Sequence, residues 1–250
     1  MKMNRKLTIL LMVLGFFAGS LQAENGPFTL QVESGWILPG YNTVEIPRDT
    51  GTRISLSDDL GIDSEFYFRL RLSFRLAPRQ ELSVLYAPLS LNARGDLPGP
   101  VHFEGVLFPS GTAVDALYRF NSYRLTYRYR VIRSERLDLW VGFTAKIRDA
   151  EISITSPLLE SSKTNVGFVP LLHWLLDWKA GEKWGIWFEG DALAAPQGRA
   201  EDITLAGYYQ VGTGLRIRAG YRMVEGGANV DETYNFALIH YLYAGFDWQF

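Results

Sequence analysis

The sequence predicts an all-β fold: an antiparallel, up-and-down transmembrane β-barrel, with ten strands preferred and eight strands as the alternative. Three observations support this class. Apolar and polar residues alternate with a period of two over several long stretches, and helical periodicity is hard to find. Short and long connections alternate along the chain. Aromatic residues make up 14% of the chain, including 7 Trp and 13 Tyr, which suits a surface that meets a membrane interface.

The clearest alternation lies in Glu65–Leu76 and Ser122–Val131. In the first segment every second residue from Phe66 onward is apolar, and three arginines stand among the residues between them. In the second segment tyrosines, a leucine and a valine alternate with serine, threonine and arginines. Strands of a soluble β-sandwich also alternate. These runs, however, cover about ten to twelve residues, the length of a tilted strand that crosses a membrane.

Weaker alternation predicts the remaining strands, in Phe28–Trp36, Leu82–Tyr86, Leu137–Arg148, Val166–Trp178, Trp184–Asp191, Ile203–Val211, Leu215–Met223 and Tyr234–Phe250. We expect Pro88 to disturb the second of these. After Ala23 no window is apolar enough for a transmembrane helix. A membrane protein without such helices must be a closed barrel, because lipid cannot satisfy an open sheet edge.

The connections predict two unlike ends of the barrel. Short turns are expected at Ala77–Gln80, Arg133–Arg136, Lys179–Lys183 and Gly212–Gly214. Longer loops are expected at Pro39–Ser64, Gly95–Leu117, Thr155–Asn165, Ala195–Asp202 and Gly226–Thr233, with both termini on the short-turn side. If Gly212–Gly214 is only a glycine kink and another weak strand also fails, the count falls to eight. The outer loop at 95–117 predicts a hairpin around Phe108-Pro109-Ser110-Gly111, with an irregular loop as the alternative.

Residues 1–23 read as a cleaved signal peptide, which leaves residues 24–250 as a single barrel domain. A basic start is followed by the apolar run Leu7–Ala18, which is too short to span a bilayer, and by Leu21-Gln22-Ala23 before the expected cut. An N-terminal membrane anchor is the alternative. Cleavage removes three basic residues and leaves 22 against 27 acidic ones, a net charge of −5 that does not favour nucleic acid. The chain has no cysteine, which excludes disulfides, thiolate metal sites and a Cys nucleophile.

The end of the chain carries a recognisable pattern. Tyr243, Gly245, Trp248 and Phe250 resemble the C-terminal signal of bacterial outer-membrane β-barrels, in which a terminal aromatic residue follows alternating large and small ones. The resemblance implies export to the outer membrane of a Gram-negative cell and recognition by the barrel assembly machinery. It covers only the last strand. The chain also resembles, at the level of size, the small porin-like barrels, and no narrower family is indicated.

The most prominent chemical feature is a set of charged residues predicted to line the lumen. They lie on the polar faces of the strands: Arg69, Arg71, Arg75, Arg124, Arg128, Arg130, Lys146, Arg148, Glu189, Asp191, Arg216, Arg218 and Arg222. Further acids that could pair with the arginines are Glu33, Glu65, Glu81, Asp138, Asp177 and Asp247. A barrel of this size is barely wider than its side chains. The charges therefore predict either a closed plug of ion pairs or a narrow, arginine-lined path for small anions.

The histidines give weaker indications. His173 is expected to face the lumen, where a dyad would require a neighbouring strand to supply Glu189 or Asp191. His240 falls on the lipid face and His102 in the outer hairpin. Neither a metal signature nor a cofactor motif is present. Three functions remain: a structural or surface-interaction barrel, a narrow anion channel, and a membrane-embedded lipid-modifying or hydrolytic enzyme. The partner would be outer-membrane lipid, with a small anionic solute or a surface ligand. The sequence does not decide whether the chain is an enzyme, and it favours a protein without enzymatic activity.

Overall fold

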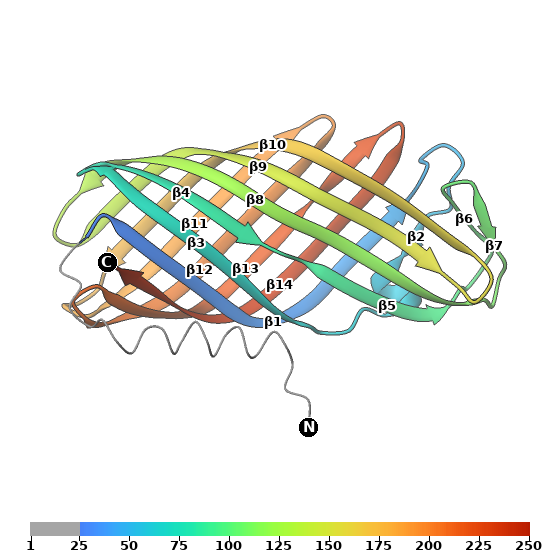
Figure 1. Cartoon of the computed structure of the whole chain (residues 1–250), viewed down its shortest axis with the longest axis horizontal. Coiled ribbons are helices and arrows are strands. Elements are labelled where there is room, and N and C mark those ends of the chain that lie inside the picture. Colours follow the sequence, from blue (N-terminus) through green and yellow to red (C-terminus); the bar gives the residue numbers. More distant parts are fainter. Residues whose placement is uncertain (1–25) are drawn as a thin grey trace, which may run out of the picture.

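The computed structural model describes residues 26–250, and the expected signal peptide at 1–23 lies outside the described residues. The chain forms a closed antiparallel barrel of ten strands, which confirms the preferred count (Figure 1). The wall consists of β1 (Phe28–Glu45), β3 (Phe66–Ala77), β4 (Gln80–Ala87) continued by β5 (Ser90–Asp96), β8 (Ala113–Arg133), β9 (Leu137–Thr155), β10 (Glu160–Lys179), β11 (Trp184–Ala195), β12 (Gly198–Gly212), β13 (Leu215–Val230) and β14 (Thr233–Gln249). No helix among residues 26–250 is long and apolar enough to cross a membrane.

The first and last strands close the barrel. β14 pairs with β1 from Thr29↔Gln249 to Glu45↔Tyr234. The backbone N–H groups of Phe28 and Phe250 each donate to the other residue's carbonyl oxygen, at 3.1 and 3.0 Å. This ladder removes both sheet edges, as lipid requires.

The third strand of the wall is broken in two. β4 ends at Ala87 and β5 begins at Ser90, and both pair with β8. Pro88 lies in the break, because proline lacks the N–H that the ladder would use. The expected disturbance is therefore a short interruption in a single wall strand.

Tight turns at 78–79, 134–136, 180–183 and 213–214 gather at one end of the barrel, together with Phe250. We call this the short-turn end and the opposite end the cap end. Residues 46–65 and 97–112 form two long loops at the cap end, and we call these loops together the cap. Figure 1 shows the cap with β2 (Ile54–Ser55), β6 (Val101–Phe103) and β7 (Val106–Phe108) at the right and the C-terminus at the left.

Several loop predictions were wrong, because the strands continue farther than their apolar alternation. β1 extends through Glu45 into the segment expected to be a loop. The long loops expected at Thr155–Asn165, Ala195–Asp202 and Gly226–Thr233 are tight turns at 156–159, 196–197 and 231–232. The hairpin expected around residues 108–111 turns instead at Glu104–Gly105, and residues from Ala113 onward belong to the wall. Both turn residues have positive φ, 46° and 78°.

An apolar belt surrounds the barrel on its outer face. On β10 it runs from Val166 to Trp178, where every second residue is apolar, and polar outward residues follow above Val166. Twelve steps of about 3.3 Å, tilted by about 45°, span roughly 28 Å, close to the thickness of a bilayer core. On β8 and β9 the belt ends at Tyr123 and Ile147, and the strands continue beyond it with outward residues that are mostly polar.

A bulge in β1 changes which of its residues point into the barrel. Ile37 points inward before the bulge, whereas Asn42 and Val44 point inward after it. The register shift lies between Pro39 and Asn42. Because side chains alternate with a period of two, one extra residue moves the rest of the strand to the opposite face. The bulge thereby turns apolar side chains inward beneath the cap.

Candidate functional site

Ion pairs fill the interior nearer the short-turn end. Arg69 reaches Asp202 at 3.0 Å, and Arg218 reaches Asp247 at 2.8 Å. Toward the short-turn end, Arg128 pairs with Glu81, Arg130 with Asp138, and Arg216 with Asp177. Most of these side chains are buried. A buried charge is tolerated when it is paired and hydrogen-bonded, so the pairs explain how so many charges fit inside a narrow barrel.

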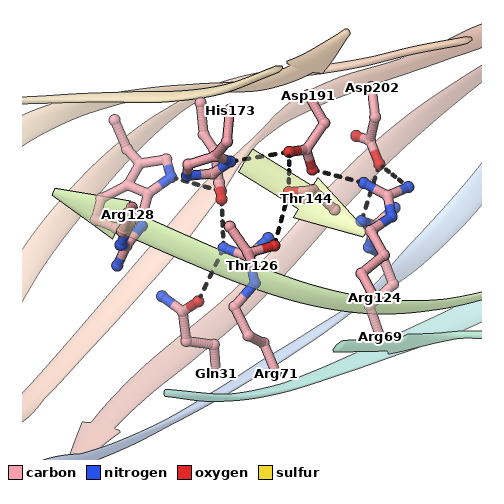
Figure 2. A network of polar contacts seen from close by, with 12 residues as sticks. Gln31, Arg69, Arg71, Arg124, Thr126, Arg128, Thr144, His173, Asp191 and Asp202 are labelled. Carbon is pink, nitrogen blue, oxygen red and sulfur yellow. Dashed lines mark hydrogen bonds and ion pairs between the residues drawn. The ribbon is translucent and has the colours of Figure 1, made fainter. Parts of the chain in front are cut away.

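Several ion pairs cross the lumen, among them Arg69 of β3 with Asp202 of β12, four strands away in the ring. Arg71 on β3 pairs with Glu189 on β11, and these strands lie opposite each other in the ring of ten. Arg124 on β8 donates to Asp202 on β12, four strands away, at 2.7 Å, and to Asp191 at 2.8 Å (Figure 2). Side chains from opposing walls therefore meet at the centre of the barrel.

Asp202 is a central acid of the network. It accepts from Arg69, Arg124 and Arg222, the last at 2.5 Å. Arg222, which is only 2% exposed, also holds both carboxylate oxygens of Glu33 at 2.8 Å. Charge-assisted hydrogen bonds of this kind are about twice as strong as neutral ones. The cluster ties β1, β3, β8, β12 and β13 together.

A histidine joins the same network. His173 Nδ1 lies 2.9 Å from Asp191 Oδ1, and the Thr144 hydroxyl donates to that same oxygen at 2.6 Å. Thr126 bonds Thr144 at 2.7 Å (Figure 2). The neighbouring strand thus brings Asp191 to His173, whereas Asp177 bonds Tyr208 and Arg216 instead. The hydroxyl faces the carboxylate, and His173 Nε2 has no hydrogen-bond partner among residues 26–250. The arrangement orients the ring but places no nucleophile beside it.

Apolar side chains close the interior at the cap end. Ile46, Ile54, Leu56 and Leu60 from the first cap loop are at most 5% exposed, as are several residues of the second loop. They pack as one cluster with inward residues of the wall: Val114, Ala116, Tyr118, Ile152, Ile154 and Ile239. Burying a large aliphatic side chain contributes about 1.5–3 kcal/mol. The cap is therefore held by a core of its own.

Hydrogen bonds join the two cap loops. The Thr52 N–H donates to the His102 carbonyl at 2.9 Å, and the Glu104 N–H donates to the Ile46 carbonyl at 3.0 Å. Lys163 of β10 pairs with Glu104 at 2.9 Å. His102 thus belongs to the cap through its backbone. On the outer surface nearby, the Arg94 guanidinium bonds Asp115 and lowers the pKa of that carboxyl.

The structure divides the predicted lumen charges into two groups. Those in ion pairs are Arg69, Arg71, Arg124, Arg128, Arg130, Arg216, Arg218, Arg222, Glu189 and Asp191. Arg75 is exposed at the short-turn end. Lys146 and Arg148 have no carboxylate partner among the described residues. Glu65 is not in the network: it is part-exposed beside β3 and accepts from Asn92 at 2.8 Å.

The sequence analysis missed several members of the network, among them Asp202, Thr126 and Thr144. Asp202 fell inside a segment expected to be a loop. Its own alternation could have placed it, because it shares a face with Thr204 and lies opposite Ile203. The threonines carry no charge and so gave no signal, although both lie on predicted polar faces.

The residues of the C-terminal pattern lie on both faces of β14. Tyr243 points inward and is buried, and Gly245 approaches the backbone of Val32 on β1. Trp248 and Phe250 lie outside, with ring centroids 4.6 Å apart, and Phe250 also stacks on Phe28. His240 is likewise on the outer face, where its Nδ1 lies 2.5 Å from the Tyr221 hydroxyl.

Comparisons with known proteins bear on the fold. No family model matches the chain, and no curated protein matches it by sequence. Among solved structures, the outer membrane protease OmpT from Escherichia coli is similar over 93% of this chain and 99% of its own, with 10% identity and a TM-score of 0.54. The attachment invasion locus protein Ail of Yersinia pestis aligns with 11% identity over 88% of this chain and 99% of its own, with a TM-score of 0.40. At such identity the likeness to OmpT concerns architecture alone: this chain has the β-barrel fold of an outer-membrane protein.

Proposed function

We propose that this chain is an outer-membrane barrel with a closed interior, of structural or surface-interaction type, exported through a cleaved signal peptide. The observation that carries the proposal is the double closure of the lumen, by ion pairs that meet from opposing walls and by the apolar cluster under the cap. The apolar belt supports the membrane location, because exposed apolar side chains surround the barrel over a bilayer's thickness.

The surface at the cap end supports an interaction role. β8, β9 and β10 extend beyond the belt with polar outward residues, and the tip between β9 and β10 carries Leu158, which is 93% exposed. We propose that this surface, which stands clear of the belt, is where a partner would contact the barrel. For assembly, we propose that the outward aromatic residues Trp248 and Phe250 contribute to recognition by the barrel assembly machinery. The strand that carries them closes the barrel.

The closed interior predicts little or no conductance. Purified barrel inserted in a planar bilayer should show no stable single-channel current, whereas an open porin in the same bilayer does. A variant that lacks residues 98–110 should also stay silent, because the ion-pair network does not depend on the cap. A large, stable, anion-selective current from the complete chain would contradict the proposal and support the narrow anion channel.

A further inference from the structure

The wall of the barrel has a notch between β10 and the β11–β12 hairpin. The β10–β11 ladder ends at Leu172↔Ala192. Beyond it, residues 160–171 of β10 pair with β9 only, while β11 turns back into β12 at 196–197. Figure 1 shows the β9–β10 hairpin extending well past the tip of the β11–β12 hairpin. Pro170 lies on this open edge, where a residue without an N–H leaves no ladder bond unmade.

A cavity of about 390 Å³ passes through the notch. Its lining includes Val169 and Leu171 from the inner face of β10 and also Phe168 and Pro170 from the outer face. Because both faces of one strand line it, the cavity runs around the edge of β10 from the interior to the outside. The β11–β12 turn forms the opposite rim. Open backbone at membrane depth is tolerated where it lines such a cavity.

Two cations without carboxylate partners lie on the cavity wall. Lys146 and Arg148 project from β9, directly across from Val169 and Gly167. Every fully buried arginine of the interior has a carboxylate partner, whereas these two have none among residues 26–250. Arg148 donates only to the Asn165 side chain, at 2.5 Å, and its Nε is unpaired. Unpaired charge away from bulk water is costly, so an anion would complete this site.

The acids that line the same cavity do not neutralise these cations. Asp202 is already held by three arginines, and Glu225 is held by Arg199 at 2.7 Å. Glu201 stands on the outward-facing side of β12, at the rim. Arg148 therefore keeps a positive charge at the inner end of the cavity.

The mouth of the cavity lies at the cap-side border of the apolar belt. Phe168 is 64% exposed and Val166 is 72% exposed, and both belong to the belt. Asp149, which pairs with Val166 on β9, begins the polar surface. An occupant would thus have its apolar part in the surrounding lipid and its charged part inside the wall.

We propose that the notch binds an anionic amphiphile from the surrounding leaflet: a phosphate or carboxylate headgroup on Lys146 and Arg148, with one acyl chain lying over Phe168 and Pro170. The volume is near the lower limit of small-molecule sites, which hold about 300–1,000 Å³, and so fits a headgroup and the start of one chain. The leaflet as the source of the ligand rests on the membrane location proposed above. The binding of an anionic headgroup by Lys146 and Arg148 does not depend on that location.

Binding by the purified full chain in a neutral detergent tests the proposal. Calorimetric titration with palmitate and with palmitoyl lysophosphatidic acid tells a carboxylate source from a phosphate source. At least one should bind. Monopalmitin, which has no charge, and inorganic phosphate, which has no chain, should bind at least tenfold more weakly. The double variant Lys146→Ala/Arg148→Ala should lose at least tenfold in affinity, and Lys183→Ala, in a short turn, should lose none.

Val169→Trp serves as a second variant, because it fills the cavity and retains both charges. It should also weaken binding at least tenfold, and the shift in gel migration on heating confirms that each variant is folded. Wild-type affinity in the double variant, or equal binding of monopalmitin and palmitate, would overturn the proposal. Inorganic phosphate binding as tightly as the amphiphiles would reduce the site to a simple anion site and would also overturn it. A conducting barrel that still bound the amphiphile would refute the closed-interior function alone.

Discussion

At the scale of residues, the interior is organised by arginines that share acids. The sequence predicted which charges face inward, because facing follows from alternation within one strand. It could not predict the partners, since Arg71 and Glu189 are brought together only when the ring closes. Asp202 was missed for a different reason: it fell inside a segment expected to be a loop, although its alternation with Ile203 and Thr204 places it on the inner face.

Removing a central arginine should destabilise the barrel strongly. Arg222→Met leaves Glu33 and Asp202 with fewer partners in a buried site, which costs about 3–5 kcal/mol. The matched control is Arg53→Met, whose pair with Glu45 is partly exposed and contributes about 0–1 kcal/mol. Urea unfolding of both variants in lipid vesicles gives the free energies. Equal losses in the two variants would show that the network does not carry the stability assigned to it.

At the scale of elements, strand length explains what the sequence revealed and what it concealed. Inside the belt, lipid requires an apolar outer face, and there the alternation located all ten strands. Beyond the belt, water allows polar residues outside, as on 160–165 of β10, and the pattern resembles a loop. The notch was likewise hidden, because it depends on the unequal heights of two hairpins. Pro170, which lies on the open edge, is a local sign of it.

The open edge of β10 predicts that the barrel tolerates proline at residue 170 but loses stability when proline replaces residue 172. Pro170→Ala should change the free energy of unfolding by less than about 0.5 kcal/mol, because no ladder bond on the notch side is gained. Leu172→Pro should cost about 2 kcal/mol or more, since Leu172 pairs with both Phe143 and Ala192. Urea unfolding measures both. A Leu172→Pro variant as stable as Pro170→Ala would mean that the ladder also ends below residue 172.

At the scale of the whole molecule, the barrel combines two kinds of closure with one lateral opening. Ion pairs close the short-turn half, an apolar cluster closes the cap half, and the notch connects the inner wall with the belt. Alternation predicted the barrel, and the two long cap loops bear out the expected difference between its ends, although the three other connections at the cap end are tight turns. The cap's core was not predictable, because its apolar residues lie in turn-rich segments and acquire inward positions only by folding over the lumen.

A barrel that spans a bilayer with a closed interior should keep water away from its inward residues, and spin-label accessibility measures this. The absence of native cysteine allows single labels at Ser83 and Thr126, which face inward, and at Val84 and Leu125, which face the belt. In vesicles, the outward labels should collide with oxygen dissolved in lipid and not with a water-soluble nickel complex, and the inward labels should collide with neither. Inward labels reached by the nickel complex would show an open lumen, and outward labels reached by it would show that the belt does not lie in lipid.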